Sequence, residues 1–457
     1  MSITSFKSLE RIGSAGRRKT GALLLFALIC SPGASVAADA LSEARASYEQ
    51  KKYEQVLKIL DPLVANGKAV SGALELRVRT YLKLKQPEKA VPDYLRWADH
   101  RGQDDARLLR ELAFQVIAAA VGDMREQMRG AALTALKEIG GADTLPALEE
   151  ALADQSGLVR ALAVEGVARG GRAAKSKRLR KLLYDPAAIV RVAALRALGE
   201  SGDRTLIPEI EPLLKDGQPR VQAAAGAALA ALGRPEALSQ ALEMLKNPKP
   251  DERAAALRIL GHVKDERVTP SLLNALSDRE ATVRATAAGI LAERGGADAA
   301  SAVAPLLKDP VPLVRGVAAA GLSKLVGAKA AALIEPLLQE SVPLVRAEAA
   351  AALLPYRPAS AGPIVRESMQ SPDPGVRSAV AKALGQSGNA ALPYLLELLN
   401  DQTPRPRISA IRSLGRIGTE KHIAALKPIL RDADVAVRVT AAGAIGRLLV
   451  GSTTEGG

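Results

Sequence analysis

Apolar and polar positions repeat along residues 115–450 with a period of 31 residues. The register is set by one position, here called repeat position 0, which is arginine in ten of eleven copies. Alanine follows at position +3 in ten copies, and an aliphatic residue at position +7 in all eleven. These three positions share one helical face, which is predicted to pack inward. Position 0 holds Arg129, Arg160, Arg191, Gln222, Arg253, Arg284, Arg315, Arg346, Arg377, Arg407 and Arg438, with a step of 30 residues before Arg407.

Other positions keep the same register and divide each copy into two helices. Proline recurs at position −14, where a first helical turn tolerates it, and glycine recurs at position +11, where it ends a helix. A second set of prolines, four residues after position −14, is predicted to bend the first helix. Position −6 is a turn position, occupied by Asp123, Asp154, Asp185, Asp216, Asn247, Asp278, Asp309, Glu340, Ser371, Asp401 and Asp432.

The repeated acid and arginine have two interpretations. As active-site residues, they would take part in catalysis. As structural residues, the acid would cap the following helix and pair with an arginine of its own or an adjacent copy. Nearly every copy carries both residues, and a ladder of identical charges is typical of architecture. We therefore predict the structural role.

An inter-helix acid, Val-Arg six residues later and proline early in the first helix resemble HEAT repeats, as in "DPAAIVRVAALRALGESGD" at residues 185–203. The short period is similar to that of phycobilin lyases and deoxyhypusine hydroxylase. The resemblance implies an all-α chain: a right-handed α-solenoid superhelix of about eleven HEAT-like helix pairs over residues 123–450. At roughly 10 Å between packed helices, the stack would extend on the order of 100 Å. Three prolines in "LPYRPASAGP" at 354–363 are expected to interrupt or redirect it.

Residues 38–122 keep a different period, of 34 residues. Tyr53 and Pro87 occupy equivalent positions, as do Leu60 and Tyr94. This helix-turn-helix pattern resembles tetratricopeptide repeats, although their usual Trp and Gly are missing. Trp97, the single tryptophan, is predicted to pack within this segment rather than to bind a ligand.

The N-terminus has the pattern of a secretory signal. Five basic residues and one acid precede the apolar run "GALLLFALIC" at 21–30, and Ser35 and Ala37 are small residues spaced for signal cleavage. We expect residues 1–37 to be a signal peptide and 451–457 a flexible tail. The protein would then be periplasmic or secreted, and not an integral membrane protein after cleavage. The only cysteine, Cys30, would leave with the signal.

Charge and residue types narrow the functional classes. The net charge of +14 falls to about +10 without the signal, and aromatic residues make up only 2%, which disfavours nucleic acid as a partner. Deoxyhypusine hydroxylase needs several His-Glu pairs for its irons, whereas His100, His262 and His422 are followed by Arg, Val and Ile. No metal site, cofactor site or catalytic motif is predicted, so we expect a protein that is not an enzyme.

One candidate site remains, a basic cluster without an intervening acid. We expect a non-catalytic exported scaffold or adaptor that binds another protein in the cell envelope through its solenoid surface. Two alternatives stay open: electrostatic binding of anionic envelope components through the basic cluster, and a lyase-like or chaperone-like helper of a modified protein. The cluster consists of Arg169, Arg172, Lys175, Lys177, Arg178, Arg180 and Lys181.

Overall fold

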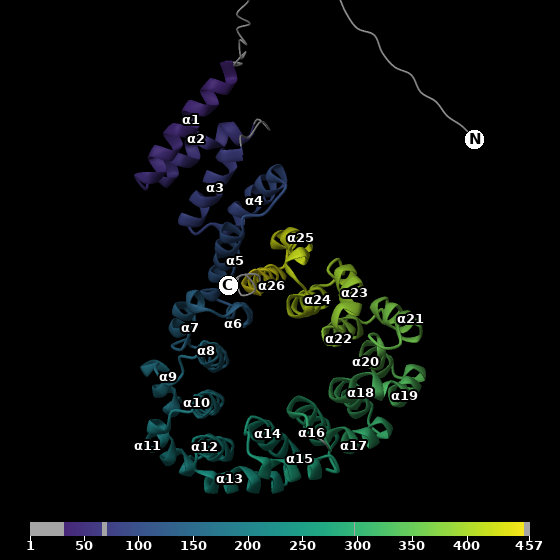
Figure 1. The fold of residues 1–457 in the computed structure, drawn as a ribbon. Helices are drawn as coiled ribbons and strands as arrows, with labels where there is room; N and C mark the ends of the chain where they lie inside the picture. The colour runs from purple at the N-terminus through teal and green to yellow at the C-terminus, as the bar shows by residue number, and fades with distance from the viewer. Residues whose placement is uncertain (1–31, 66–70, 297, 452–457) are drawn as a thin grey trace, which may run out of the picture. The chain divides into compact units, whose positions relative to one another are not determined.

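The computed structural model describes residues 32–65, 71–296 and 298–451, and every regular element in these residues is a helix (Figure 1). The basic and apolar parts of the expected signal peptide, and the tail from residue 452, lie outside the described residues. Contacts divide the chain into two compact units, Met1–Val70 and Ser71–Gly457. In the first unit, α1 (Pro32–Glu49) and α2 (Tyr53–Ala65) pack against each other. Val56 and Leu60 are buried between them.

The second unit begins with three helices that precede the repeats: α3 (Ser71–Lys83), α4 (Pro87–Arg101) and α5 (Ala106–Val121). Trp97 is 1% exposed, and its ring packs beside Tyr94. The guanidinium of Arg101 lies over the indole, 4.7 Å from its centroid. Trp97 is therefore a core residue, as predicted.

The repeats build two concentric rows of helices, which Figure 1 shows most clearly from α8 to α24. The inner row carries repeat position 0 near the start of each helix. Its members are α6 (Glu126–Ile139), α8 (Gly157–Arg169), α10 (Ala188–Glu200), α12 (Pro219–Ala231), α14 (Pro250–Gly261), α16 (Ala281–Arg294), α18 (Pro312–Val326), α20 (Pro343–Leu353), α22 (Pro374–Leu384), α24 (Pro404–Ile417) and α26 (Val435–Gly451).

The outer row is made of shorter α-helices, most of them joined to 3-10 turns. Its α-helices are α7 (Leu145–Ala151), α9 (Lys177–Lys181), α11 (Ile207–Ile210), α13 (Leu238–Glu243), α15 (Thr269–Ala275), α17 (Ala299–Val303), α19 (Ala331–Ile334), α21 (Pro358–Met369), α23 (Leu392–Leu398) and α25 (Ile423–Leu426). The 3-10 turns are η1 (Ala142–Thr144), η2 (Leu182–Tyr184), η3 (Arg204–Leu206), η4 (Glu211–Lys215), η5 (Pro235–Ala237), η6 (Met244–Lys246), η7 (Glu266–Val268), η8 (Ala304–Lys308), η9 (Gly327–Ala330), η10 (Glu335–Gln339), η11 (Gly388–Ala391), η12 (Glu420–His422) and η13 (Lys427–Arg431).

The repeat residues take the places that their spacing predicts. Leu198, Leu260 and Leu322, all at position +7, are at most 1% exposed. Prolines of the second set stand at the start of η4, η8, η10 and η13, where the outer helix changes from α to 3-10 geometry. Glycine at position +11 has a positive φ in six of the seven copies predicted to end a helix with it, for example 72° at Gly202.

The segment 354–363 does not interrupt the stack. Here the outer helix is the unbroken α21, with Pro363 inside it. Helix α21 packs on both α20 and α22, which also contact each other directly. The expectation of a break was wrong because these prolines sit in the turn and on the outer helix, and the packing of successive inner helices does not involve them.

One stretch of the described residues, Pro312–Gln339, is long and apolar enough by composition to cross a membrane. It consists of the inner helix α18 followed by the outer elements η9, α19 and η10. Its Val314, Leu322 and Ile334 are buried among neighbouring repeats. Its apolar character is that of a repeat core.

Ion pairs tie each copy to the next along one edge of the array. Arg284 illustrates the arrangement: its Nε donates to Asp309 Oδ2 at 2.7 Å, and one terminal nitrogen donates to Asp309 Oδ1 at 2.8 Å. The other terminal nitrogen donates to the carbonyl oxygen of Asp278, in the turn of its own copy, at 2.7 Å. The Asp309 carboxylate also accepts the N–H of Val311. The hydrogen bond from Arg284 lowers the pKa of Asp309 below its usual value.

We call this series of pairs the ladder, and its pairs rungs. The structural interpretation of the repeated charges is confirmed, with the acid's partner coming from the preceding copy. Where position −6 is Ser371, Arg346 pairs instead with Glu367 on α21. The rungs are Arg129–Asp154, Arg160–Asp185, Arg191–Asp216, Arg253–Asp278, Arg284–Asp309, Arg315–Glu340, Arg346–Glu367, Arg377–Asp401 and Arg407–Asp432.

One rung has lost both charges. Position 0 of α12 is Gln222, and the facing position −6 is Asn247. The Gln222 amide still donates to the carbonyl oxygen of Asp216 at 2.6 Å, so it keeps the bond within its own copy. The ion pair of the ladder is missing here, and α12 and α14 are joined instead by the ion pair of Arg220 and Glu252, while they pack less extensively than other successive inner helices.

The second unit closes on itself. The last inner helix, α26, packs against both α5 and α6. Gly443 makes this approach possible, because a Cβ there would lie 2.8 Å from the Cβ of Ala135. Lys427 Nζ lies 2.8 Å from Asp104 Oδ1, across 323 residues of sequence. Asp104 also accepts a hydrogen bond from the Tyr94 hydroxyl.

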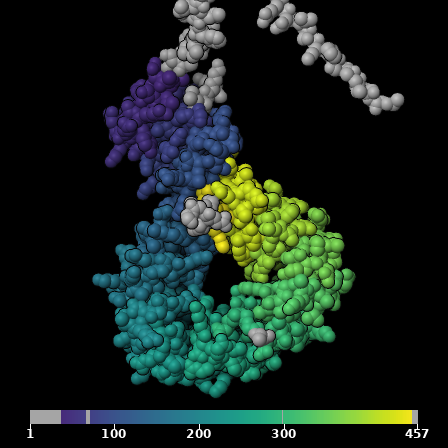
Figure 2. All heavy atoms as spheres, viewed as in Figure 1, coloured from purple at the N-terminus to yellow at the C-terminus, as the bar shows by residue number. Residues whose placement is uncertain are grey.

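The repeats therefore form a ring, and Figure 2 shows the opening inside it. The array therefore does not continue as an open stack, because its last helix meets α5 and α6. A constant rotation from each copy to the next closes a ring when its sum returns the last helix to the first. The 31-residue period does not reveal the size of that rotation.

We predict that Arg284→Gln lowers the free energy of unfolding by about 2 kcal/mol, since Asp309 loses its charged partner. The double variant R284Q/D309N reproduces the neutral pair found naturally at 222 and 247. The double variant should lose less unfolding free energy than the two single variants lose in sum. Urea unfolding of the four proteins measures the coupling, and purely additive effects would contradict a rung at this position.

We also predict that a carbodiimide, which joins a lysine and a carboxylate in direct contact, links Lys427 to Asp104. Gly443→Leu should reduce the yield of this link strongly, because its side chain would displace α26 from Ala135. Gly289→Leu is the matched control at the same repeat position, where the nearest atom to an added Cβ is 4.0 Å away. Peptide mass spectrometry measures the yield, and equal yields from both variants would rule out this closure.

Candidate binding groove

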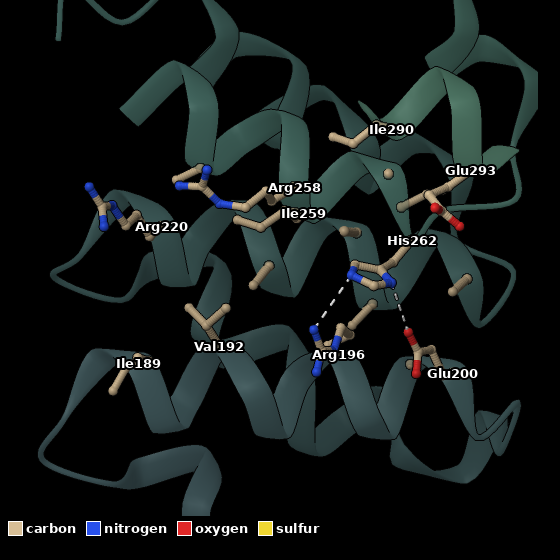
Figure 3. Close-up of a pocket in the computed structure, with 18 of the residues that line it drawn as sticks. Ile189, Val192, Arg196, Glu200, Arg220, Arg258, Ile259, His262, Ile290 and Glu293 are labelled. Carbon is tan, nitrogen blue, oxygen red and sulfur yellow. Dashed lines mark hydrogen bonds and ion pairs between the residues drawn. The ribbon is translucent and has the colours of Figure 1, made fainter. Parts of the chain in front are cut away.

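A groove of about 820 Å³ lies on the inner faces of α10, α12, α14 and α16 (Figure 3). Its floor is α12, which presents there the side chain of Arg220 and a row of methyl groups. The methyl groups belong to Ala224, Ala227, Ala228 and Ala231, which follow one another at helical spacing. Small side chains along one face of a helix leave room above it for another chain.

Branched side chains form the apolar walls of this groove. Ile189 and Val192 come from α10, Ile259 from α14 and Ile290 from α16. Ile189 is 54% exposed, which is unusual for a large aliphatic side chain. The groove opens at the copy whose rung is neutral, and α12 and α14 pack less extensively than other successive inner helices. A recessed floor and less extensive packing therefore coincide.

One end of the groove is crossed by polar side chains from α10 and from the end of α14. His262 lies between two residues of α10: its Nε2 is 3.4 Å from an Arg196 nitrogen, and its Nδ1 is 3.4 Å from Glu200 Oε1. Arg196 also donates to Glu165 at 2.7 Å, and Glu165 accepts a second bond from Lys137. This network spans α6 to α14 and passes over α12.

Burial, followed by the nearby charge of Arg196, lowers the pKa of His262 below its ordinary value of 6.5. Glu200 and Glu165 act in the opposite direction but do not outweigh these two effects. The neutral imidazole is therefore favoured in the folded protein. The stability that this site contributes is present above pH 6.5 and is lost as the pH falls through the lowered value.

The remaining charges of the groove are paired, with one exception. Arg220 donates two bonds of 2.8 Å to Glu252, and Glu293 pairs with Lys324. Arg258 is exposed and makes no ion pair with any residue in the described part of the chain. The groove therefore combines an apolar surface with one available cation.

Metal-binding chemistry has no candidate in the described ranges, where no three His, Cys, Asp or Glu side chains gather as a ligand set. The histidines lie apart: His100 is in α4, His262 follows α14 and His422 is in η12. His422 Nδ1 accepts the N–H of Thr419, a local bond that supports the turn.

The predicted basic cluster is split over three elements. Arg169 ends α8, Arg172 and Lys175 stand in the following turn, and the other four cations are on α9 in the outer row. All except Arg180 are exposed. Arg180 is half-buried and lies 3.5 Å from Glu209. The cluster is separate from the groove, and none of its residues lines it.

The groove residues were not predicted from the sequence, although a signal for them exists. Positions −2, +5 and +9 of the inner helices line the groove, as Ile189, Arg196 and Glu200 do in α10. In α12 position +9 is Ala231, where every other copy carries a larger residue, whereas a small residue at position +5, here Ala227, is shared with four other copies. Comparing these positions across the copies would have marked α12 as recessed.

A family model described as HEAT repeats matches residues 176–251, 239–323, 330–407 and 392–455, together more than half of the chain. A second model, described as PBS lyase HEAT-like repeat, matches residues 128–154. No curated protein matches the chain.

Several solved structures are similar to part of this chain. The complex of CpcE and CpcF of phycocyanin lyase from a Nostoc species shows 24% identity, with 47% of this chain and 86% of that chain covered and a TM-score of 0.35. Human deoxyhypusine hydroxylase shows 23% identity, with 62% and 98% covered and a TM-score of 0.30. Escherichia coli YibA shows 19% identity, with 55% and 96% covered and a TM-score of 0.34. No functional inference follows from similarities of this size.

We predict that Arg196→Gln raises the pKa of His262 toward 6.5, because it removes the nearest positive charge while burial remains. Arg258→Gln is the control, since Arg258 lines the same groove but is not among the charges that shift the pKa of His262. Imidazole proton shifts followed by NMR during a pH titration give both values. An unchanged pKa in R196Q would contradict the contact between Arg196 and His262.

Proposed function

Because this chain belongs to the HEAT-repeat family, we propose that it is a non-catalytic scaffold that binds a segment of another protein in the groove over α12. The observation that carries the proposal is the alanine floor between walls of exposed aliphatic residues. An exposed aliphatic surface in a concave site is typical of a binding surface, because its burial by a partner is favourable.

We further propose that the protein is exported and works in the cell envelope. The support is the basic and apolar pattern of residues 7–30, followed by small residues at 35 and 37. The partner would then be another exported or envelope protein.

A second candidate function is electrostatic binding of anionic envelope components by the basic cluster. It is supported by six exposed cations within residues 169–181, a stretch that contains no acid. The cluster lies on and beside the outer helix α9, so a large polyanion could reach it from outside the ring.

We predict that Ile189→Asp abolishes capture of the partner, because it places a charge on the apolar wall of the groove. Leu333→Asp is the matched control: Leu333 is also 54% exposed, but it lies on the outer helix α19. Tagged full-length proteins would be recovered from an envelope extract, and the retained proteins compared by quantitative mass spectrometry.

Partners retained by the wild type and L333D but lost from I189D support the groove. Two results would contradict it: an identical set of retained proteins for I189D and the wild type, or equal losses from both variants.

A further inference from the structure

The positions that line the groove also identify the inward-facing residues of inner helices outside it. In α10 these are positions −2, +5 and +9, held by Ile189, Arg196 and Glu200. In α14 positions +5 and +9 are Arg258 and His262, which line the same groove. Since the inner helices keep the same register, the equivalent residues of α22 and α24 face the inside of the ring as well, whereas position +5 of α26 is Gly443, which packs against Ala135 of α6.

On α24 all three of these positions are arginine. Arg405, Arg412 and Arg416 stand at −2, +5 and +9, and all three are exposed. Position +9 of the neighbouring helix α26 is Arg447, which is half-buried. None of these four arginines forms an ion pair with an acid in the described residues. We call them the inner arginine strip.

The strip rests on a firmly packed support. A terminal nitrogen of Arg416 reaches the carbonyl oxygen of Lys382 on α22 at 3.4 Å, and its side chain lies over Gly385, where an added Cβ would collide with it. Ser413 Oγ donates to the carbonyl oxygen of Ala381 at 2.8 Å, which ties α24 to α22. The cations are therefore presented by a fixed helix face.

Two acids at the corresponding inner positions of other helices are engaged in ion pairs, and these positions of α22, α24 and α26 hold no acid at all. Glu165 is bound by Lys137 and Arg196, and Glu293 is paired with Lys324. The unpaired charge along this arc of the ring is therefore positive.

We infer that the inner arginine strip binds a run of carboxylates in an acidic polypeptide segment. Arginine presents a planar fork of donors that matches a carboxylate with two bonds, and several arginines in a row fit several acids in a row. The strip lies inside a closed ring, where a flat membrane surface cannot reach it but a single polypeptide can. The inference rests on the proposed protein-binding function and adds the chemistry of a second contact.

The test uses full-length protein and a fluorescein-labelled oligoglutamate peptide, with binding followed by anisotropy at low salt. The wild type should bind the peptide, and R405E/R412E/R416E should weaken binding by about tenfold or more. The neutral variant R412Q/R416Q should weaken it by an intermediate factor. Unchanged circular dichroism and melting of this milder variant keep the test valid if the triple variant folds poorly.

The matched control is K175E/K177E/R178E, which reverses three charges of the basic cluster. It should leave peptide binding within about twofold of the wild type, because the remaining long-range charge effect is screened by salt. Absence of wild-type binding would overturn the inference, as would a control that weakens binding as much as the inner triple variant. A third result would also contradict the inference: inorganic polyphosphate binds to the strip and oligoglutamate does not. The ligand would then be a phosphate polymer. Neither peptide result depends on Ile189, so failure here leaves the groove proposal standing.

Discussion

The ladder of arginine and acid is the interaction on which this architecture depends. Each arginine holds two successive turns at once: it binds a carbonyl of its own turn and the carboxylate of the next. A rung of this kind fixes both the distance and the angle between neighbouring copies on one edge. The same step repeated from copy to copy gives a constant curvature. Here that curvature returns α26 to α5 and α6, where Gly443 allows the helices to meet.

The exception to the ladder explains the position of the groove. At Gln222 and Asn247 the charged bond between copies is absent, while the bond within the copy is kept. On the same helix, Ala231 at position +9 replaces the larger residue that every other copy carries there. The groove thus lies where one ion pair of the ladder is absent and where the side chains of α12 are small. The network of Arg196, His262 and Glu200 spans the gap from α10 to α14 and maintains the spacing there.

Much of the fold could be predicted from the sequence, because the features that build each repeat depend on residues close together in the chain. The 31-residue period, the buried leucines and the glycine turns all depend on residues within one copy or its neighbour. Closure of the ring could not be predicted in this way, because it depends on a small rotation between successive copies, summed over eleven copies. The contact of Lys427 with Asp104 joins residues that no local pattern relates.

The candidate sites divide in the same way. The basic cluster was predicted because its residues are adjacent in the chain, whereas Arg405, Arg412 and Arg416 gather only when the helix brings their positions to one face. The groove was not predicted for a related reason. It is formed by small side chains, and a few more alanines in an alanine-rich repeat do not stand out in the sequence.

Helix α24 carries both kinds of arginine within a few residues: one in the ladder and others in the inner arginine strip. Arg407, at position 0, has a side chain only 15% exposed and pairs with Asp432 at 2.9 Å. Arg405, two residues earlier, is exposed and has no acidic partner in the described residues. Each rung is electrically neutral as a pair, so the ladder adds nothing to the net charge of +14. The surplus must lie on arginines and lysines outside the ladder. An arginine of the ladder is largely buried with its charge paired to an acid, whereas the arginines of the inner strip have no acidic partner among the described residues and can bind one from another chain.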